Sequence, residues 1–258
     1  MKFQKANELP IPEKEYLWQY LDLHEFLYFL LEQKLFFKRL DKLSDPNEGV
    51  PYKYLIALHG TKSPGGENWE KYREKLWNDL VPQYQKGQFV NCWYLGNRES
   101  VAMWNLYSGP SGVAIKIEAN QLINHVKKKV LEVENSIYEK MLYGLVDYRN
   151  LNPFDLNEYY QNIQSYEGEE TGVKKDKSYD HEREFRFWAV LPHGINKMEE
   201  PPEYFQLDIS PVEEISFQII HHPEMKPWQV KNLRKLLAIQ NLETRLKVPD
   251  TEIRKICF

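Results

Sequence analysis

The sequence predicts an α+β fold, built as a single mixed domain with a largely antiparallel central sheet flanked by helices. Stretches with the two-residue alternation of strands interchange along the chain with stretches of helical periodicity. The 258 residues contain no internal repeat, and 42% hydrophobic with 28% charged residues is typical of a globular protein. We therefore expect one domain over residues 1–258, with an extended N-terminal lead (1–15) and a surface loop or lid (166–178).

A strand, helix and strand with tight joints form the centre of this prediction. Phe89 to Leu95 is an apolar strand, Ser100 to Ser108 is a short helix, and Gly112 to Glu118 is a second strand. Ser100 suits the N-cap, and the glycine and proline residues after Ser108 end the helix. Helical spacing puts Met103, Trp104 and Tyr107 on one face. That face packs in the core, or else Trp104 and Tyr107 wall a pocket for a flat ring.

The N-terminal part alternates strand and helix. Tyr16 to Tyr20 reads as a strand, and Asp22 is the expected N-cap of a helix that reaches Gln33. Five apolar residues at helical spacing indicate its buried face: Leu23, Phe26, Leu27, Leu30 and Leu31. Extended structure over Lys34 to Leu40 then leads into a loop containing Asp45 and Glu48. Asp45 either caps backbone amides in an Asx turn, or one of the two carboxylates faces a cleft.

The middle of the chain is expected to continue with helices and short strands. Helices are predicted over Trp69 to Gln85, Asn120 to Lys129 and Leu156 to Ser165, and extended structure over Val130 to Val133 and Leu142 to Tyr148. After the loop or lid, the chain from Glu182 to Leu191 alternates as a strand with an apolar far end. Such a strand is expected inside a sheet, so the charges at its start need an explanation. Glu182, Glu184 and Arg186 either lie solvated at the sheet edge or line a cleft where they pair and titrate abnormally.

The C-terminal part is predicted to add a strand, a helix and short end pieces. Glu213 to Ile220 is apolar, and Lys226 to Ile239 is a helix with Pro227 in its first turn. A short strand near Leu246 and a helical turn from Asp250 follow. His221 and His222 are adjacent in an extended stretch, so their side chains point apart, and the sequence predicts no metal site there.

Composition and missing motifs exclude several classes. A formal charge of −4 gives no broad attraction for a phosphate backbone, and two cysteines, Cys92 and Cys257, form no disulfide framework. Cys92 is interpreted as a buried structural residue. No secretory signal or apolar run of membrane-spanning length is present, so we expect a cytoplasmic protein with no membrane partner. Glycine-rich phosphate loops, the G-x-S-x-G elbow, H-E-x-x-H and C-x-x-C are all absent.

Several short motifs, in order, resemble a widespread bacterial domain-of-unknown-function family. They are N-D-P-x-E (here Ser44 to Glu48), C-F-S (Cys92 to Tyr94), M-W-x-x-Y (Met103 to Tyr107), G-V-x-I (Gly112 to Ile115) and K-x-x-x-W-x-x-E-x-E-W-R (ending at Tyr179, Glu182, Glu184 and Arg186). Ser44 stands where the family has asparagine, and Tyr179 where it has tryptophan. This resemblance implies no particular reaction.

The layout is also similar to that of ADP-ribosyltransferases of the bacterial toxin type. This resemblance implies an ADP-ribosyltransferase-like fold, NAD as the cofactor, and Glu184 as the catalytic carboxylate with Glu182 beside it. It further implies that Arg186 keeps the carboxylates ionised or binds phosphate, and that Tyr20, Trp104 and Tyr107 clamp the nicotinamide ring. Such enzymes carry Arg or His on the first strand, where this chain has Gln19 and Tyr20.

Three functional hypotheses follow. The first is a nucleotide-using transferase, a toxin or phage-defence effector acting on nucleic acid or protein. The second is a non-catalytic ligand- or partner-binding module, in which the same charges form structural ion pairs. The third is a metal-dependent nuclease-type effector that uses Asp45, Glu48 and Glu184 to hold a divalent ion. The oligomeric state is not encoded in any of these features.

Overall fold

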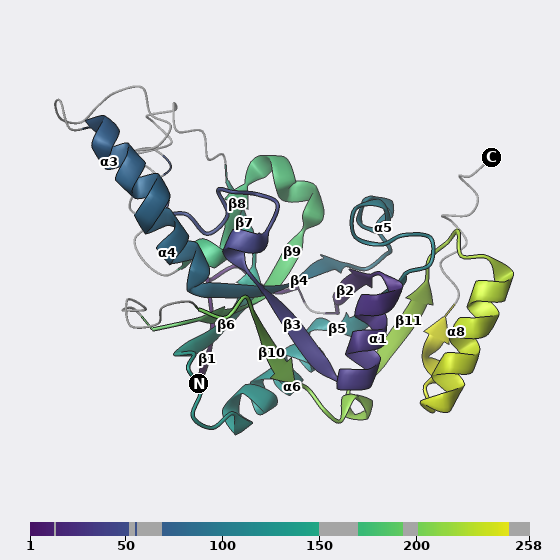
Figure 1. The fold of residues 1–258 in the computed structure, drawn as a ribbon. Coiled ribbons are helices and arrows are strands. Elements are labelled where there is room, and N and C mark those ends of the chain that lie inside the picture. Colours follow the sequence, from purple (N-terminus) through teal and green to yellow (C-terminus); the bar gives the residue numbers. More distant parts are fainter. Residues whose placement is uncertain (13, 52–54, 56–68, 150–169, 193–200, 248–258) are drawn as a thin grey trace. The chain divides into compact units, whose positions relative to one another are not determined.

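The computed structural model describes residues 1–258 except 13, 52–54, 56–68, 150–169, 193–200 and 248–258 (Figure 1). Ten strands of the described residues belong to one mixed, mostly antiparallel sheet, which confirms the predicted α+β class. The chain divides into two compact units, each made of three separate segments. Unit 1 comprises residues 1–10, 36–91 and 130–207, and unit 2 comprises residues 11–35, 92–129 and 208–258. The single domain and the ADP-ribosyltransferase-like fold stay predictions.

Unit 1 is built on strands β1 (Lys2–Lys5), β6 (Lys140–Leu145), β9 (Glu184–Val190) and the first half of β4 (Gln88–Gly96), in that order. β1 runs parallel to β6, and β6 runs antiparallel to β9. β3 (Lys34–Arg39) pairs antiparallel with β4, and β10 (Tyr204–Asp208) pairs with β3. All seven residues of β9 are buried, as expected of the internal strand that its apolar end predicted.

A compact run of short elements precedes β9 in unit 1. It contains the 3₁₀ turn η3 (Glu170–Val173), strand β8 (Lys174–Asp176) and the 3₁₀ turn η4 (Lys177–Glu182). β8 pairs in parallel with β7 (Asp147–Arg149). Within the predicted surface loop or lid (166–178), the described part therefore has regular structure, and Val173 is fully buried.

A long helical rod in unit 1 consists of α3 (Trp69–Lys75), the π-helical turn η2 (Leu76–Leu80) and α4 (Val81–Lys86), drawn end to end in Figure 1. The predicted helix over Trp69 to Gln85 is confirmed in extent. Its burial is uneven, because Leu76 is fully buried whereas Tyr72 is 44% exposed. The π turn inserts a wider winding at this point, which rotates later side chains away from ideal helical spacing.

Unit 2 is built on the second half of β4 followed by β2 (Tyr16–Leu21), β5 (Val113–Glu118), β11 (Phe217–His221) and β12 (Leu246–Lys247). β2 and β11 flank β5, both antiparallel to it. The strand predicted from Glu213 begins later than expected, because residues 212–214 form the 3₁₀ turn η6 (Val212–Glu214). The short strand near Leu246 is confirmed, paired in parallel with β11.

Helix α1 (Leu23–Glu32) of unit 2 has the predicted start. The Asp22 side chain accepts from the Glu25 N–H, and the Glu25 side chain accepts from the Asp22 N–H, so both form a capping box. The predicted buried face was shifted, since Leu31 is 62% exposed and Phe29 is buried instead. The observed buried face consists of Phe26, Phe29 and Leu30. It is rotated about the helix axis relative to the predicted face, so that both phenylalanine rings enter the core.

Three further helices complete the described part of the fold: α5 (Val101–Tyr107), α6 (Ala119–Glu132) and α8 (Pro227–Ile239). Ser100 caps α5 by accepting from the Met103 N–H, as predicted. The extended structure predicted at Val130 to Val133 is wrong, because α6 continues to Glu132. Val130 is fully buried one turn after the equally buried Val126, and this helical spacing prevails over the β preference of valine.

Some expectations fall elsewhere than predicted. Within the N-terminal lead, β1 is extended and also joins the sheet by pairing with Lys140 to Tyr143. The predicted helix at Leu156 to Ser165, the turn from Asp250 and Cys257 lie outside the described residues. Cys92 is partly rather than fully buried. No helix among the described residues combines the length and apolar character needed to cross a bilayer.

Candidate functional site

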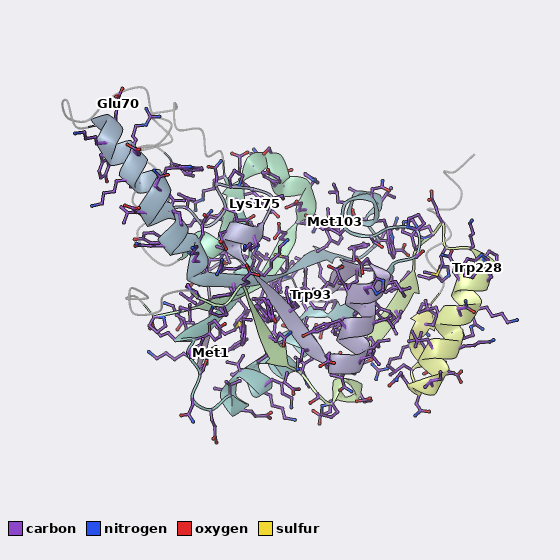
Figure 2. The ribbon with its side chains drawn as sticks, in the orientation of Figure 1. Met1, Glu70, Trp93, Met103, Lys175 and Trp228 are labelled. Atoms are coloured by element: carbon purple, nitrogen blue, oxygen red, sulfur yellow. The ribbon has the colours of Figure 1, made fainter. Side chains whose placement is uncertain are left out.

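Five charged side chains meet inside unit 1: Glu48, Lys175, Glu182, Glu184 and Arg186, called here the charge cluster. Each is buried, with 7% or less of the residue exposed. They come from the loop before Gly49, from β8, from η4 and from β9, and Figure 2 labels Lys175. Removing charged groups from water is costly unless they are paired, so this concentration of charge in a core requires a close geometric match.

Arg186 anchors the cluster on β9. Its Nε donates to Oε2 of Glu184 at 2.6 Å, its Nη1 donates to the Gly172 carbonyl at 2.8 Å, and its Nη2 forms an ion pair with Glu48. Glu184 and Arg186 lie two residues apart on one strand, so they share a face of the sheet. The predicted alternation of side chains along this strand is therefore confirmed for Glu184 and Arg186.

Lys175 bridges the three carboxylates. Its Nζ donates to Oε2 of Glu182 at 2.5 Å and to Oε1 of Glu184 at 2.8 Å, and lies 3.7 Å from Oε2 of Glu48. Glu182 precedes β9 rather than belonging to it, because the strand begins at Glu184 after a left-handed residue, Arg183, with φ 40°. Lys175 still brings Glu182 and Glu184 together.

The two neighbouring glutamates titrate in opposite directions. Burial alone would raise the pKa of Glu184, but Arg186, a hydrogen bond with Glu182 and Lys175 hold that pKa well below its usual range. Burial raises the pKa of Glu182, and the hydrogen bond to Glu184 and its negative charge raise it further. Glu184 is therefore the ionised member of the pair, and Glu182 is the member that holds a proton more readily.

The charge of Lys175 is fixed by its partners. Burial by itself lowers the pKa of a lysine, but the carboxylates of Glu184 and Glu48 outweigh burial, and the pKa of Lys175 is raised above its usual range. Lys175 is thus a permanent cation at neutral pH. It serves as an electrostatic partner for the carboxylates and not as a nucleophilic amine.

Two tyrosines complete the surroundings of the charge cluster. The Tyr148 hydroxyl accepts from the backbone N–H of Glu184 at 2.8 Å, and burial together with the charge of Glu184 raises the pKa of Tyr148. The Tyr179 ring lies against Lys175, with 4.5 Å between the ring centroid and Nζ. Tyr148 thus lies beside Glu184 and Tyr179 beside Lys175, and both tyrosines are partly exposed.

The loop that carries Asp45 and Glu48 confirms the Asx-turn interpretation, while the facing of a cleft stays a prediction. Asp45 accepts from the Asn47 N–H at 2.9 Å, which is the predicted Asx turn. Glu48 points into the charge cluster. Gln85 of α4 holds the loop by donating to the carbonyls of Pro46 and Glu48, each at 2.9 Å.

The rings assigned to a nicotinamide clamp belong to unit 2. Trp104 and Tyr20 are 2% and 6% exposed and pack edge to face, with centroids 4.9 Å apart. The Tyr20 hydroxyl accepts from the Ser100 N–H, and Trp104 Nε1 donates to Glu99. Tyr107 is 49% exposed, so it does not share the buried face of Met103 and Trp104. Trp104 and Tyr20 thus fill the core of unit 2, the first of the two interpretations offered for the helix face.

Metal-binding geometry is not found in the part of the chain that the structure describes: no three His, Cys, Asp or Glu side chains are grouped to hold an ion. Glu48 and Glu184, two of the three carboxylates of the nuclease hypothesis, are paired with Arg186 and Lys175. A divalent ion would have to displace those cations. His221 Nδ1 donates to the His222 carbonyl, and His222 Nδ1 accepts from the Glu224 N–H, so the backbone uses one nitrogen of each ring.

Three residues of the site were not identified as such from the sequence: Lys175, Tyr148 and Tyr179. Lys175 lies in a polar stretch that reads as a surface loop, yet it stands at the lysine position of the K-x-x-x-W-x-x-E-x-E motif. That spacing was a usable signal. Tyr148 carries none, because its role depends on the pairing of β7 with β8.

Comparison with known proteins adds one match. Residues 103–187 match the sequence pattern of DUF2971, described as a protein of unknown function. The matched stretch contains M-W-x-x-Y at its start and the Glu182-x-Glu184-x-Arg186 motif at its end, whereas Glu48 lies outside it. No curated protein and no solved structure matches the chain.

Proposed function

We propose that the charge cluster is the catalytic centre of a nucleotide-using transferase of the ADP-ribosyltransferase type, with NAD as the nucleotide. The observation that carries this proposal is the pairing of two buried carboxyl groups, Glu182 and Glu184, on the ammonium of Lys175, with Glu184 also bonded to Arg186. This environment lowers the pKa of Glu184 and raises that of Glu182. Neighbouring carboxyl groups whose environments separate their pKa values are characteristic of enzymes that divide acid–base and charge-stabilising roles between them.

The chemistry of the donor set fits a ribosyl transfer. NAD, when bound, would supply a ribosyl carbon that becomes electron-poor as nicotinamide departs. Glu184 is held ionised by Arg186 and Lys175, so its carboxylate is suited to stabilise developing positive charge where water is scarce. Glu182, with its raised pKa, is suited to take up the proton of the acceptor group.

The clamp is the part of the resemblance that the local packing supports least. Trp104 and Tyr20 are used in the core of unit 2, with their polar atoms bonded to Glu99 and Ser100. Within unit 1, the ring beside the carboxylates is Tyr179. Arg186 is occupied by Glu184, Glu48 and the Gly172 carbonyl, so its proposed role is to keep Glu184 ionised, not to bind phosphate.

The test is nicotinamide release from NAD by the full-length protein, with and without a bacterial lysate as a source of nucleic-acid and protein acceptors. We expect Glu184→Gln to reduce release by about 10²- to 10³-fold, the scale of losing one preorganised electrostatic group. Glu182→Gln should reduce release less and flatten its pH profile. Glu203→Gln, which removes an exposed carboxylate of unit 1, is the matched control.

Ligand binding provides an independent readout. A ligand that binds only the folded protein stabilises it by roughly 2.7 kcal/mol at a hundred times its Kd, so NAD should raise the melting temperature. A wild-type protein that neither releases nicotinamide nor melts higher with NAD would refute the proposal. A rise with magnesium or manganese instead would favour the nuclease-type effector.

A second candidate is a non-catalytic ligand- or partner-binding module in which the cluster is a structural ion network. The observation that favours it is that the five side chains are all buried and form ion pairs with one another. This candidate expects Glu184→Gln to lose stability without any catalytic activity being present in the wild type.

A further inference from the structure

The charge cluster is buried throughout, and the turn η4, which carries Glu182, reaches the surface at Tyr179. Glu184 and Arg186, on the internal strand, are 7% and 1% exposed. Tyr179, on η4, is partly exposed, and its neighbours Ser178 and Asp180 are exposed. A molecule that reaches Lys175 or Glu182 from solvent on this side therefore meets Tyr179 first.

Tyr179 covers the cation of the cluster. Its ring centroid lies 4.5 Å from Nζ of Lys175, the ammonium that also donates to Glu182 and Glu184. An ammonium over an aromatic face is attracted by the ring quadrupole, more strongly when water is excluded. The Tyr179 ring thus contacts the ammonium of Lys175, which also holds the carboxylates of Glu182 and Glu184.

Tyr179 and Glu182 are carried by the same short turn. They are three residues apart in the 3₁₀ turn η4, and side chains at that spacing eclipse, so both face Lys175. The turn begins after Asp176, whose side chain accepts from the Ser178 N–H at 2.9 Å. It ends at Arg183, which holds φ 40°, a conformation that non-glycine residues adopt at a cost.

The loop that carries Asp45 also affects Tyr179. The negative charge of Asp45, followed by burial, raises the pKa of the Tyr179 hydroxyl. The hydroxyl is therefore neutral at physiological pH. Lys175 contacts the ring, and the charge of Asp45, from another segment of unit 1, acts on the hydroxyl.

We propose that Tyr179 is the entrance residue of the charge cluster: its ring shields Lys175 and Glu182 from solvent, and a substrate must displace it or stack on it to reach them. Tyr179 is then a specificity-determining residue that favours substrates with a flat ring. The substrate part of this inference rests on the proposed function, whereas the shielding of Lys175 does not.

The shielding is tested by acetylating the full-length protein at alkaline pH with a small amine-reactive reagent and following each lysine by mass spectrometry. The reagent reacts with the minor neutral fraction of each amine, and that fraction at Lys175 increases when the cation–π contact is lost. In Tyr179→Ala the rate at Lys175 should rise by about 2- to 30-fold, the range expected for losing one cation–π contact. Tyr179→Phe keeps the ring and should label like the wild type. Exposed Lys177 reports whether the reagent is equally active in each sample, and buried Lys174 reports whether β8 has loosened.

The outcomes separate cleanly. Equal labelling of Lys175 in the wild type and in Tyr179→Ala overturns the proposal, as does an equal rise at Lys174 and Lys175, which signals loosening of the whole segment. If the wild type turns over NAD, Tyr179→Ala should raise KM more than it lowers kcat. If it does not, the proposed function fails, while the labelling result still decides the role of Tyr179.

Discussion

Glu184 is the side chain whose removal should reveal how the charge cluster contributes to stability. Replacing it by glutamine leaves Arg186 and Lys175 buried with one carboxylate fewer, and breaking a buried ion pair costs about 3–5 kcal/mol. We expect Glu184→Gln to lose free energy of unfolding on this scale in urea denaturation at pH 7. The control is Glu203→Gln, which breaks the exposed pair with Lys42 and should cost at most about 1 kcal/mol.

The lowered pKa of Glu184 also predicts that the protein loses stability at acid pH. The pKa of Glu184 lies below the ordinary glutamate value of 4.5 in the folded protein, so its stabilisation is fully present above pH 4.5 and is lost as the pH falls through the lowered folded pKa. Between pH 7 and pH 3, the melting temperature of the wild type should fall more steeply with decreasing pH than that of Glu184→Gln. Parallel curves would show that Glu184 is not held ionised.

Gly172 is a position where one methyl group should disturb the site. A Cβ there would lie 2.5 Å from the indole of Trp188, which is 1% exposed and has no room to move, while the Gly172 carbonyl accepts from Arg186. Overpacking of this kind costs roughly 1–3 kcal/mol. Gly172→Ala should therefore lower the melting temperature, whereas Gly109→Ala, with nothing within 4 Å, should not. Similar melting temperatures for both variants would contradict this reading of the contact.

At the residue scale, sequence reasoning found the acidic pair but not its organiser. The spacing of Glu182, Glu184 and Arg186 on an apolar strand signalled charges that need partners. Lys175 was missed because a lysine among glycine, glutamate and aspartate residues looks solvated. Its long-range approach to Glu48 and Glu184 makes it a core residue, which the polarity of the stretch conceals and only the motif spacing could have signalled.

At the scale of the element, the cap of α1 makes a quantitative prediction. Asp22 accepts from the Glu25 N–H at 2.8 Å, satisfying one of the donors that a helix leaves free at its start. Asp22→Ala should cost about 0.5–2 kcal/mol of stability, measured by urea denaturation. Asp22→Asn keeps an accepting oxygen and should cost much less. An alanine variant as stable as the asparagine variant would mean that water replaces the cap fully.

Elements with strong periodicity or capping signals were predictable, and elements defined by pairing were not. The starts of α1 and α5 follow from Asp22 and Ser100. β1 was missed because K-F-Q-K has neither an apolar run nor a turn signal, and it is a strand only through its pairing with β6. Val130 was read as extended, although its burial one turn after Val126 keeps it in α6.

At the scale of the whole molecule, the chain passes repeatedly between its two units, and this limits how it can be divided. Each unit is assembled from three segments, and β4 contributes its first half to unit 1 and its second half to unit 2. The stretch matched to DUF2971 (103–187) takes part of each. The boundaries of that match therefore do not coincide with those of either compact unit.

The matched stretch should consequently not fold alone. In the whole chain β5 is hydrogen-bonded on both sides, to Tyr16–Leu21 and to Phe217–His221, and a fragment of residues 103–187 lacks both strands. It also lacks β1, the outer partner of β6, and Glu48 of the charge cluster. Exposed strand edges and the loss of the Glu48 partner of buried Arg186 then oppose compaction. We expect the fragment to show narrow amide dispersion in NMR spectra and no cooperative thermal transition, while the full chain shows both wide dispersion and a transition. A sharp transition in the fragment would mean that the contacts between β6 and β9 suffice to organise it.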